Sequence, residues 1–236
     1  MTEPHLASIQ VSLPRSFGQE GAADPMDRPW TTGFFKEAVV GPVQLRLTNL
    51  DGDGQADRVH HGGRDKAVLA YSAEHYPIWR QLMNQPSLPF GAFGENFTVT
   101  GLTEADVCIG DTWRVGDEVV VQVSQPRQPC WKLARRWRIK TLAFEVQQTG
   151  RTGWYFRVLT EGTVAAGMRL TLADRPYPDW TVDRANRLMH LDKKNTSAAL
   201  ELAAIPLLSE NWQATLARRA QQQESDPQKR LIGENE

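Results

Sequence analysis

The chain has 236 residues, enough for one large domain and a small one, and its 40% apolar and 23% charged residues are typical of a globular protein. A net charge of −1 excludes a global attraction to nucleic acid or anionic lipid. No apolar run approaches the roughly 20 residues that would span a bilayer, and no export signal opens the chain. We therefore expect a soluble, cytoplasmic protein that binds neither membrane nor nucleic acid.

Short runs with strand patterns, separated by Gly and Pro, recur as far as Leu172. Alternation of Ile9, Val11 and Leu13 with polar residues predicts a first or edge strand. Gly116-Asp117 between two of the runs is the strongest hairpin signal. The other strands are expected over 43–47, 67–71, 96–100, 112–115, 118–124, 154–160 and 168–172. This spacing favours a barrel or sandwich over a regular βαβ alternation.

Three helices are expected between these strands, over 72–83, 129–137 and 142–148. The second begins with Pro129, at a position where the missing N–H costs little. The third stops before Gly150, a residue suited to a helix end.

The composition changes after the last strand. Residues 1–173 are expected to form the strand-rich domain and 174–180 a linker. Three helices are predicted over 181–224, with Thr181, Thr196 and Ser209 as their caps. The remaining residues, 225–236, are predicted to be a polar and frayed tail.

Cys130 is the strongest candidate for a functional residue. It follows a proline-stiffened segment and stands at the start of an expected helix near Arg127, and both features lower a thiol pKa. Such a thiolate is a nucleophile or a soft-metal ligand. The alternative is that Cys130 is only a small, buried apolar residue, which is how we interpret Cys108. Two cysteines cannot hold an iron–sulfur cluster, which needs about four thiolates, so electrons for any redox reaction must come from another protein.

Three other segments carry candidate binding residues. Over 60–66 the glycines and the cations Arg64 and Lys66 can hold a phosphate, although an ordinary tight turn is favoured. The segment 91–96 is either a cofactor-facing loop or a β-turn. The basic run from Lys132 to Lys140 is interpreted first as a solvated helix face. The second interpretation is that it helps to hold an anionic ligand or docks an acidic redox partner.

Taken together, several stretches resemble the MOSC family, and specifically its YiiM-like branch. They are the residues at 32–36, 41–43, 54–57, 61–68, 91–96, 109–111, 124–130 and 149–154. The resemblance covers roughly residues 7–172, and the helical end is similar to the three-helix domain that follows MOSC in this branch. It implies a mixed α/β, strand-rich fold: a MOSC-type β-barrel with peripheral helices and a small all-α C-terminal domain. Ala38, where the family often has Pro, and His60 before the expected His61 are small departures.

The resemblance also implies a function. A MOSC domain of this kind binds molybdenum cofactor (Mo-molybdopterin), and the motif cysteine, here Cys130, is the catalytic residue and the molybdenum ligand. The implied reaction reduces N-hydroxylated compounds, such as hydroxylamino purine base analogues, and so detoxifies them. The electrons would come from a separate reductase, flavoprotein or iron–sulfur protein.

Candidate cofactor-binding residues follow from the same motifs. They are Thr32, Lys36, His61, Gly62, Gly63, Lys66, Phe93, Gly94, Glu95, Asn96, Ser124, Arg127 and Arg151. A molybdopterin carries a phosphate and a polar ring, so backbone donors, a cation and an amide suit it. We expect Lys66, Asn96, Arg127 and Arg151 to converge on one cleft with Cys130.

Two other functions fit the same residues. Cys130 can carry a persulfide in a protein that delivers sulfur, or the domain can bind and carry the cofactor without catalysis while the helices recruit a partner.

Overall fold

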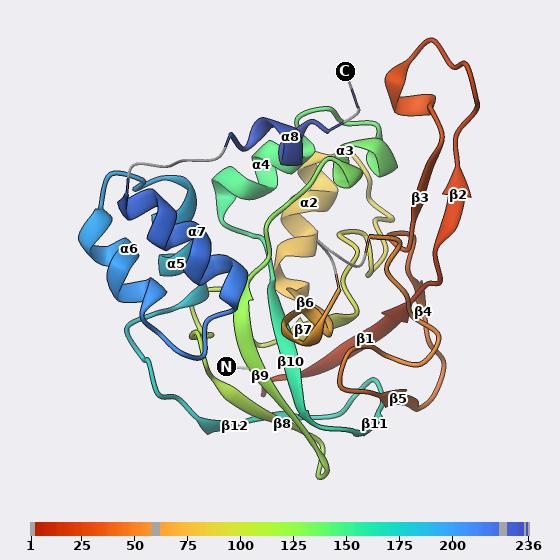
Figure 1. Ribbon diagram of the computed structural model, residues 1–236. Helices are drawn as coiled ribbons and strands as arrows, with labels where there is room; N and C mark the ends of the chain where they lie inside the picture. Colours follow the sequence, from red (N-terminus) through yellow and green to blue (C-terminus); the bar gives the residue numbers. More distant parts are fainter. Residues whose placement is uncertain (1–2, 58–61, 222–225, 234, 236) are drawn as a thin grey trace.

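A computed structural model describes residues 3–57, 62–221, 226–233 and 235 (Figure 1). Its main feature is an eight-stranded sheet with the strand order β12-β8-β9-β10-β6-β7-β1-β4. β6 and β7 pair in parallel, and the other neighbouring strands of this sheet pair antiparallel. The strands are β1 (His5–Val11), β4 (Glu37–Ala38), β6 (Val68–Ser72), β7 (Phe97–Thr100), β8 (Thr112–Val115), β9 (Val119–Pro126), β10 (Trp154–Thr160) and β12 (Leu170–Asp174).

The sheet curls until β1 meets the start of β12. The backbone N–H of Leu6 donates to the carbonyl of Met168 at 2.9 Å, and the N–H of Leu170 donates to the carbonyl of Pro4 at 2.8 Å. Strands near opposite ends of the sheet order are thereby joined, which a flat sheet would not allow. The strand-rich, barrel-like fold predicted from the sequence is confirmed as a curled half-barrel.

Two small sheets lie beside the eight-stranded sheet, and only one of their four strands, within the predicted run 43–47, was expected from the sequence. β2 (Arg15–Phe17) pairs with β3 (Trp30–Thr32), and this hairpin projects from the body of the protein (Figure 1). β5 (Val43–Leu45) pairs with β11 (Gly162–Val164). β5 lies within the predicted strand 43–47, whereas β2, β3 and β11 are too short to show a strand alternation. The pairing of β5 with β11 was not predicted, because the two strands are far apart in the sequence.

The helices of the strand-rich part share one apolar cluster with Tyr71 of β6. α2 (Tyr76–Leu82) follows a 3₁₀ turn over Ala73–His75, and α4 (Leu142–Thr149) ends at Gly150, whose φ of 71° is left-handed. Both helices were predicted within a few residues. Short 3₁₀ turns also occur at Pro25–Asp27 and Arg64–Lys66.

The predicted start of the helix after β9 is wrong. α3 covers Lys132–Trp137, so Pro129 and Cys130 lie in the loop before it rather than in its first turn. The N–H of Trp131 donates to the carbonyl of Arg230 at 2.9 Å, a partner far along the chain. Contacts with distant residues therefore hold this loop in a non-helical path.

The three predicted C-terminal helices are present. They are α5 (Val182–His190), α6 (Thr196–Ala203) and α7 (Glu210–Ala220). Thr181 and Ser209 cap the first and third as expected, whereas Asn195 rather than Thr196 caps the second, because its side chain accepts from the N–H of Ala198. Among the described residues, no helix is both long enough and apolar enough to cross a membrane.

These helices share a core with the sheet. One apolar cluster joins Val121 and Val158 of the sheet to Val182, Trp212 and Leu216 of the helices. The backbone adds direct links, since the N–H of Ser209 donates to the carbonyl of Ser124 at 2.9 Å. The helices are therefore packed against β9 rather than attached by the linker alone.

The expectation of a frayed tail is wrong for the residues that the structure describes there. Residues 226–233 include a short helix, α8 (Gln228–Leu231), which lies beside α3 and α4 and apart from α5–α7 (Figure 1). Leu231 packs against the apolar cluster that contains Trp79 and Leu133. Polar composition alone does not reveal such docking.

His190 at the end of α5 gives a testable pH dependence. Its Nε2 is buried without a hydrogen-bond partner among the described residues. Burial, helped by Arg230, Arg219 and Lys193, lowers its pKa from 6.5 to about 3. The unfolded chain therefore binds a proton below pH 6.5 that the folded chain does not, and stability falls as the pH falls from there towards 3.

We expect His190 to contribute about 2 kcal/mol to the loss of unfolding free energy between pH 7 and pH 5. Urea unfolding of His190→Leu at both pH values should show a loss smaller by that amount than in the wild type. His5→Leu, at a half-buried position at the start of β1, is the control and should behave as the wild type. Equal pH dependence in His190→Leu and the wild type would refute the prediction.

Candidate functional site

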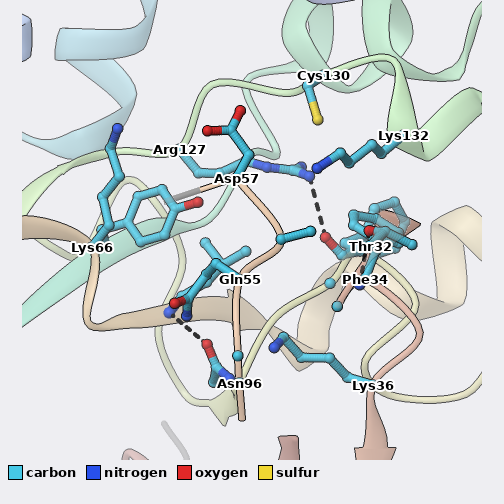
Figure 2. A pocket seen from close by; sticks show the side chains of 17 residues that line it. Thr32, Phe34, Lys36, Gln55, Asp57, Lys66, Asn96, Arg127, Cys130 and Lys132 are labelled. Carbon is cyan, nitrogen blue, oxygen red and sulfur yellow. Dashed lines mark hydrogen bonds between the residues drawn. The ribbon is translucent and has the colours of Figure 1, made fainter. Parts of the chain in front are cut away.

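A pocket opens where four loops meet beside the sheet. Its lining comes from residues 32–34 and 36 at the end of β3, 54–57, 93, 94 and 96 before β7, and 127, 130 and 132 between β9 and the start of α3, together with Lys66, Leu69 and Tyr155. Figure 2 shows Cys130 at one end of this pocket and Lys36 and Asn96 at the other. The structure thus brings together Lys66, Asn96, Arg127 and Cys130, as the sequence predicts.

Cys130 presents its thiol to the pocket. The residue is 7% exposed, and its Sγ points towards the side chains of Arg127 and Lys132 (Figure 2). The other cysteine, Cys108, is 1% exposed, and its Sγ donates to the carbonyl of Pro178 at 3.4 Å. Burial raises the pKa of Cys108, so that thiol stays neutral while Cys130 faces a cationic pocket.

The guanidinium of Arg127 has hydrogen-bond donors that the described residues do not use. The residue is 4% exposed, and its Nη2 donates to the carbonyl of Phe93 at 3.2 Å. Its Nη1 is buried and has no partner in the part of the chain that the structure describes. Because a buried unpaired donor is costly, this atom indicates an acceptor on a bound molecule.

Lys36 and Asn96 form the opposite end of the pocket, where the protein already uses their hydrogen bonds. Asn96 donates through Nδ2 to the carbonyl of Gln10 at 3.2 Å and to Asp53 at 2.9 Å. Lys36 pairs with the same Asp53, and burial lowers the pKa of Lys36 against the opposing effect of that carboxylate. These two residues shape the pocket, and their donor groups are directed mainly at Asp53.

The loop over 91–96 is organised by a buried carboxylate. Glu95 accepts from the N–H of Gly91 at 2.6 Å and of Phe93 at 3.1 Å, and from the hydroxyls of Tyr76 and Thr98. Glu95 therefore does not line the pocket itself but holds its neighbours there.

Gly94 of the same loop has a φ of +80° and lies against Phe34, where a Cβ would come within 2.6 Å of the ring. Phe93 and Gly94 line the pocket, and the ring of Phe93 stacks on that of Tyr71 at 4.5 Å. Thr32 also lines it, and its hydroxyl accepts from the N–H of Phe34 at 3.1 Å.

Other predicted residues lie elsewhere. The hydroxyl of Ser124 is 2.5 Å from the carbonyl of Asp65 and 3.1 Å from that of Tyr155, so Ser124 ties β9 to its neighbours. Gly62 and Gly63 line a second cavity next to the start of α7. His61 lies outside the described residues.

The expectation for Arg151 needs correction. This residue is not among those that line the pocket. It belongs to the turn after α4, where its carbonyl accepts from the hydroxyl of Tyr71 at 3.0 Å. The turn thus supports the aromatic residues behind the pocket instead of extending a cation into it.

Several lining residues were not among the cofactor-binding residues predicted from the sequence. They are Phe34, Gln55, Asp57, Lys132 and Tyr155. Burial raises the pKa of Tyr155 to about 12, so its phenol remains a proton donor. Burial lowers the pKa of Lys66, with Asp65 and Asp57 opposing. Two of the missed residues had a signal: Lys132 lies two residues after Cys130, and Asp57 ends one of the resembling stretches.

The basic run after Cys130 is not a solvated helix face, contrary to the first expectation for it. Arg136 donates through Nη1 to the carbonyls of Phe34 and Gly91, both at 2.8 Å. Arg138 pairs with Asp24 and Asp27. These arginines fasten the hairpin region and the pocket loops to α3.

The polar groups of the pocket suit a cofactor that already contains its metal ion. In the described ranges there is no group of three or more His, Cys, Asp or Glu residues that could hold a metal ion. A soft metal at Cys130 would therefore take its remaining ligands from a bound cofactor. The cations Arg127, Lys66 and Lys132 suit an anionic one.

Comparison with known proteins covers most of the chain. The MOSC domain model matches residues 57–171, and the model of the YiiM-like, 3-alpha helix domain matches residues 180–223. Uncharacterized protein YflK of Bacillus subtilis (strain 168) is 50% identical over 212 residues, which are 90% of this chain and 92% of that protein. A protein named Reductase from Gibberella moniliformis (strain M3125 / FGSC 7600) is 36% identical over 179 residues, or 75% of this chain, but these span only 32% of that protein.

A solved structure agrees with the sequence matches. The crystal structure of YiiM from Geobacillus stearothermophilus matches with a TM-score of 0.76 and 35% identity, and the match covers 92% of this chain and 99% of that one. Fold and sequence thus agree over both parts of the protein. The chain belongs to the MOSC family, in the branch whose MOSC domain is followed by a YiiM-like three-helix domain.

Proposed function

We propose that this protein binds molybdenum cofactor in the pocket, with Cys130 as a molybdenum ligand, and reduces N-hydroxylated compounds to the amines. The observation that carries the proposal is the pairing of a pocket-facing thiol, Cys130, with the buried unpartnered Nη1 of Arg127. MOSC domains are associated in general with molybdenum cofactor binding, and a reductase-named relative favours an oxidoreductase.

The residues present fit the cofactor. Its phosphate is an acceptor for Arg127, and Lys66 and Lys132 add positive charge. The thiol of Cys130 adds a soft ligand to the two sulfurs of a dithiolene. Phe34 and Phe93 supply apolar walls that limit the access of water.

When bound, the cofactor supplies two-electron redox chemistry at molybdenum. The overall reaction consumes the N–OH compound, two electrons and two protons, and it releases the amine and water. Nζ of Lys66 is a candidate proton donor, since burial lowers its pKa and so makes the proton easier to release. Lys132, on the other side of Cys130, can hold the substrate oxygen in place through its ammonium group.

The electrons come from a separate protein in this proposal. The whole chain has two cysteines, fewer than the roughly four thiolates that hold an iron–sulfur cluster. A reductase, flavoprotein or iron–sulfur protein is therefore expected as the partner.

The test is metal analysis followed by turnover. Protein made in a host that synthesises molybdopterin should contain stoichiometric molybdenum and reduce an N-hydroxylated purine with an artificial electron donor. Sulfane sulfur on Cys130 without molybdenum would instead establish a sulfur carrier. Bound molybdenum without reduction of any N–OH compound would establish a cofactor carrier.

A further inference from the structure

The last described residues of the chain contact the loop that carries Cys130. Residues 226–233 and 235 lie beyond both family matches, the second of which ends at residue 223. They do not continue the three-helix bundle, because α8 lies beside α3 and α4 (Figure 1). We call these residues the C-terminal strap.

The strap binds backbone groups on both sides of Cys130. Arg230 donates through Nη1 to the carbonyl of Pro129, and its own carbonyl accepts from the N–H of Trp131 at 2.9 Å. Asn235 donates through Nδ2 to the carbonyl of Trp131 at 3.0 Å. Since the loop lies between the end of β9 and the start of α3, these bonds replace the ladder and helix bonds that it lacks.

Side chains reinforce the same contact. Gly233 lies against the indole of Trp131, where a Cβ would come within 2.3 Å of Cδ1. The guanidinium of Arg135 also packs on Trp131, 4.7 Å from the ring centroid. Nε of Arg135 donates to Oδ1 of Asn235 at 2.9 Å. The residue after Cys130 is thus held by the strap through both its backbone and its ring.

Arg230 links the strap to a second element. Its Nη2 donates to Oε1 of Gln147 on α4 at 2.6 Å, while Nη1 reaches Pro129. A planar guanidinium with two fixed directions therefore sets the distance between α4 and the Cys130 loop. Burial lowers the pKa of Arg230 to about 10, and Cys130 acts in the opposite direction.

We propose that the C-terminal strap holds the Cys130 loop so that the thiol faces the pocket, and that Arg230 is the positioning residue of this device. The catalytic part of the inference rests on the proposed function. The positioning of the loop is a property of the cofactor-free chain and can be tested without it.

The first measurement is hydrogen exchange of the full-length, cofactor-free protein. In Arg230→Gln the amides of residues 127, 128 and 130–133 should exchange about tenfold faster, because the hydrogen bonds from Arg230 to the carbonyl of Pro129 and to Oε1 of Gln147 are lost. Lys229→Gln, at the exposed neighbouring position, is the matched control and should exchange as the wild type. Arg230→Lys, which can still donate to Pro129, should recover part of the protection.

The second measurement is turnover per bound molybdenum. For Arg230→Gln we expect kcat to fall about tenfold with an unchanged KM, because the substrate contacts remain while the thiol is misplaced. Unchanged hydrogen exchange in Arg230→Gln would overturn the proposal that the strap holds the Cys130 loop. Faster exchange with normal kcat would overturn Arg230 as a positioning residue. If the wild-type protein contained no molybdenum, the proposed function would be refuted. The role of the strap would then be decided by hydrogen exchange alone.

Discussion

Cys130→Ser is expected to abolish reduction of N-hydroxylated substrates while the protein remains folded. A serine hydroxyl is a hard and barely acidic ligand, so molybdenum would lose its soft protein ligand. The loss of activity per bound molybdenum should exceed the roughly 10–100-fold that is typical when only an outer partner of a metal ligand is removed. Arg127 and the lysines remain, so some cofactor should still be bound. Activity per bound molybdenum is the measurement.

Cys108→Ser is the matched control for this prediction. Cys108 is buried away from the pocket, and its Sγ already donates to the carbonyl of Pro178. A serine there can donate to the same carbonyl, so we expect a cost at the low end of about 1–3 kcal/mol in unfolding free energy. Its turnover should match the wild type. A Cys130→Ser protein that is as active as Cys108→Ser would end the proposal that Cys130 binds molybdenum.

Local signals in the sequence were sufficient to predict those strands and helices whose turns and ends are determined by adjacent residues. The hairpin of β8 and β9 was predicted because Gly116, whose φ is +61°, allows the turn between two alternating runs. α4 was predicted because Gly150 ends it. The three-residue strands β2, β3 and β11 were missed, and the pairing of β5 with β11 was not predicted, since it depends on a partner that no local pattern reveals.

The candidate site was predictable where a residue's chemistry is unusual for its position. Cys130 after a proline-stiffened segment is such a case, and Arg127 lies close to it in the sequence. What could not be predicted is how the fold uses each polar group. Asp53 takes up the donors of Lys36 and Asn96, and Tyr71 holds the backbone of Arg151. These partners are distant in sequence.

Arg127 is the residue whose replacement best separates ligand binding from structural support. In the cofactor-free protein it makes one hydrogen bond from Nη2, to Phe93, and leaves Nη1 buried without a partner among the described residues. Removing a buried, incompletely paired charge relieves a desolvation cost that offsets the lost bond. Arg127→Met should therefore change the unfolding free energy of the cofactor-free protein by less than about 1 kcal/mol.

The effect on cofactor should be much larger. A hydrogen bond between a charged donor and a phosphate contributes about 1.5–3 kcal/mol, so Arg127→Met should bind molybdenum cofactor about ten- to a hundredfold more weakly. Arg127→Lys keeps the charge but loses the bidentate hydrogen-bonding geometry of the guanidinium. Its affinity for the cofactor should therefore lie between those of Arg127→Met and the wild type. Molybdenum content after dialysis measures the effect.

Arg157→Met on β10 provides the opposite control. Arg157 donates to Asp65 at 2.9 Å and to Gln122 at 3.1 Å, so the protein itself uses its guanidinium. Its loss removes the guanidinium bonded to the carboxylate of Asp65 and to Oε1 of Gln122, and we expect lower stability with an unchanged molybdenum content. The two arginines should thus give opposite results in the same pair of assays. If Arg127→Met instead lost stability and kept its molybdenum, Arg127 would be a structural residue, and the pocket would lose the donor that best identifies its ligand as an anion.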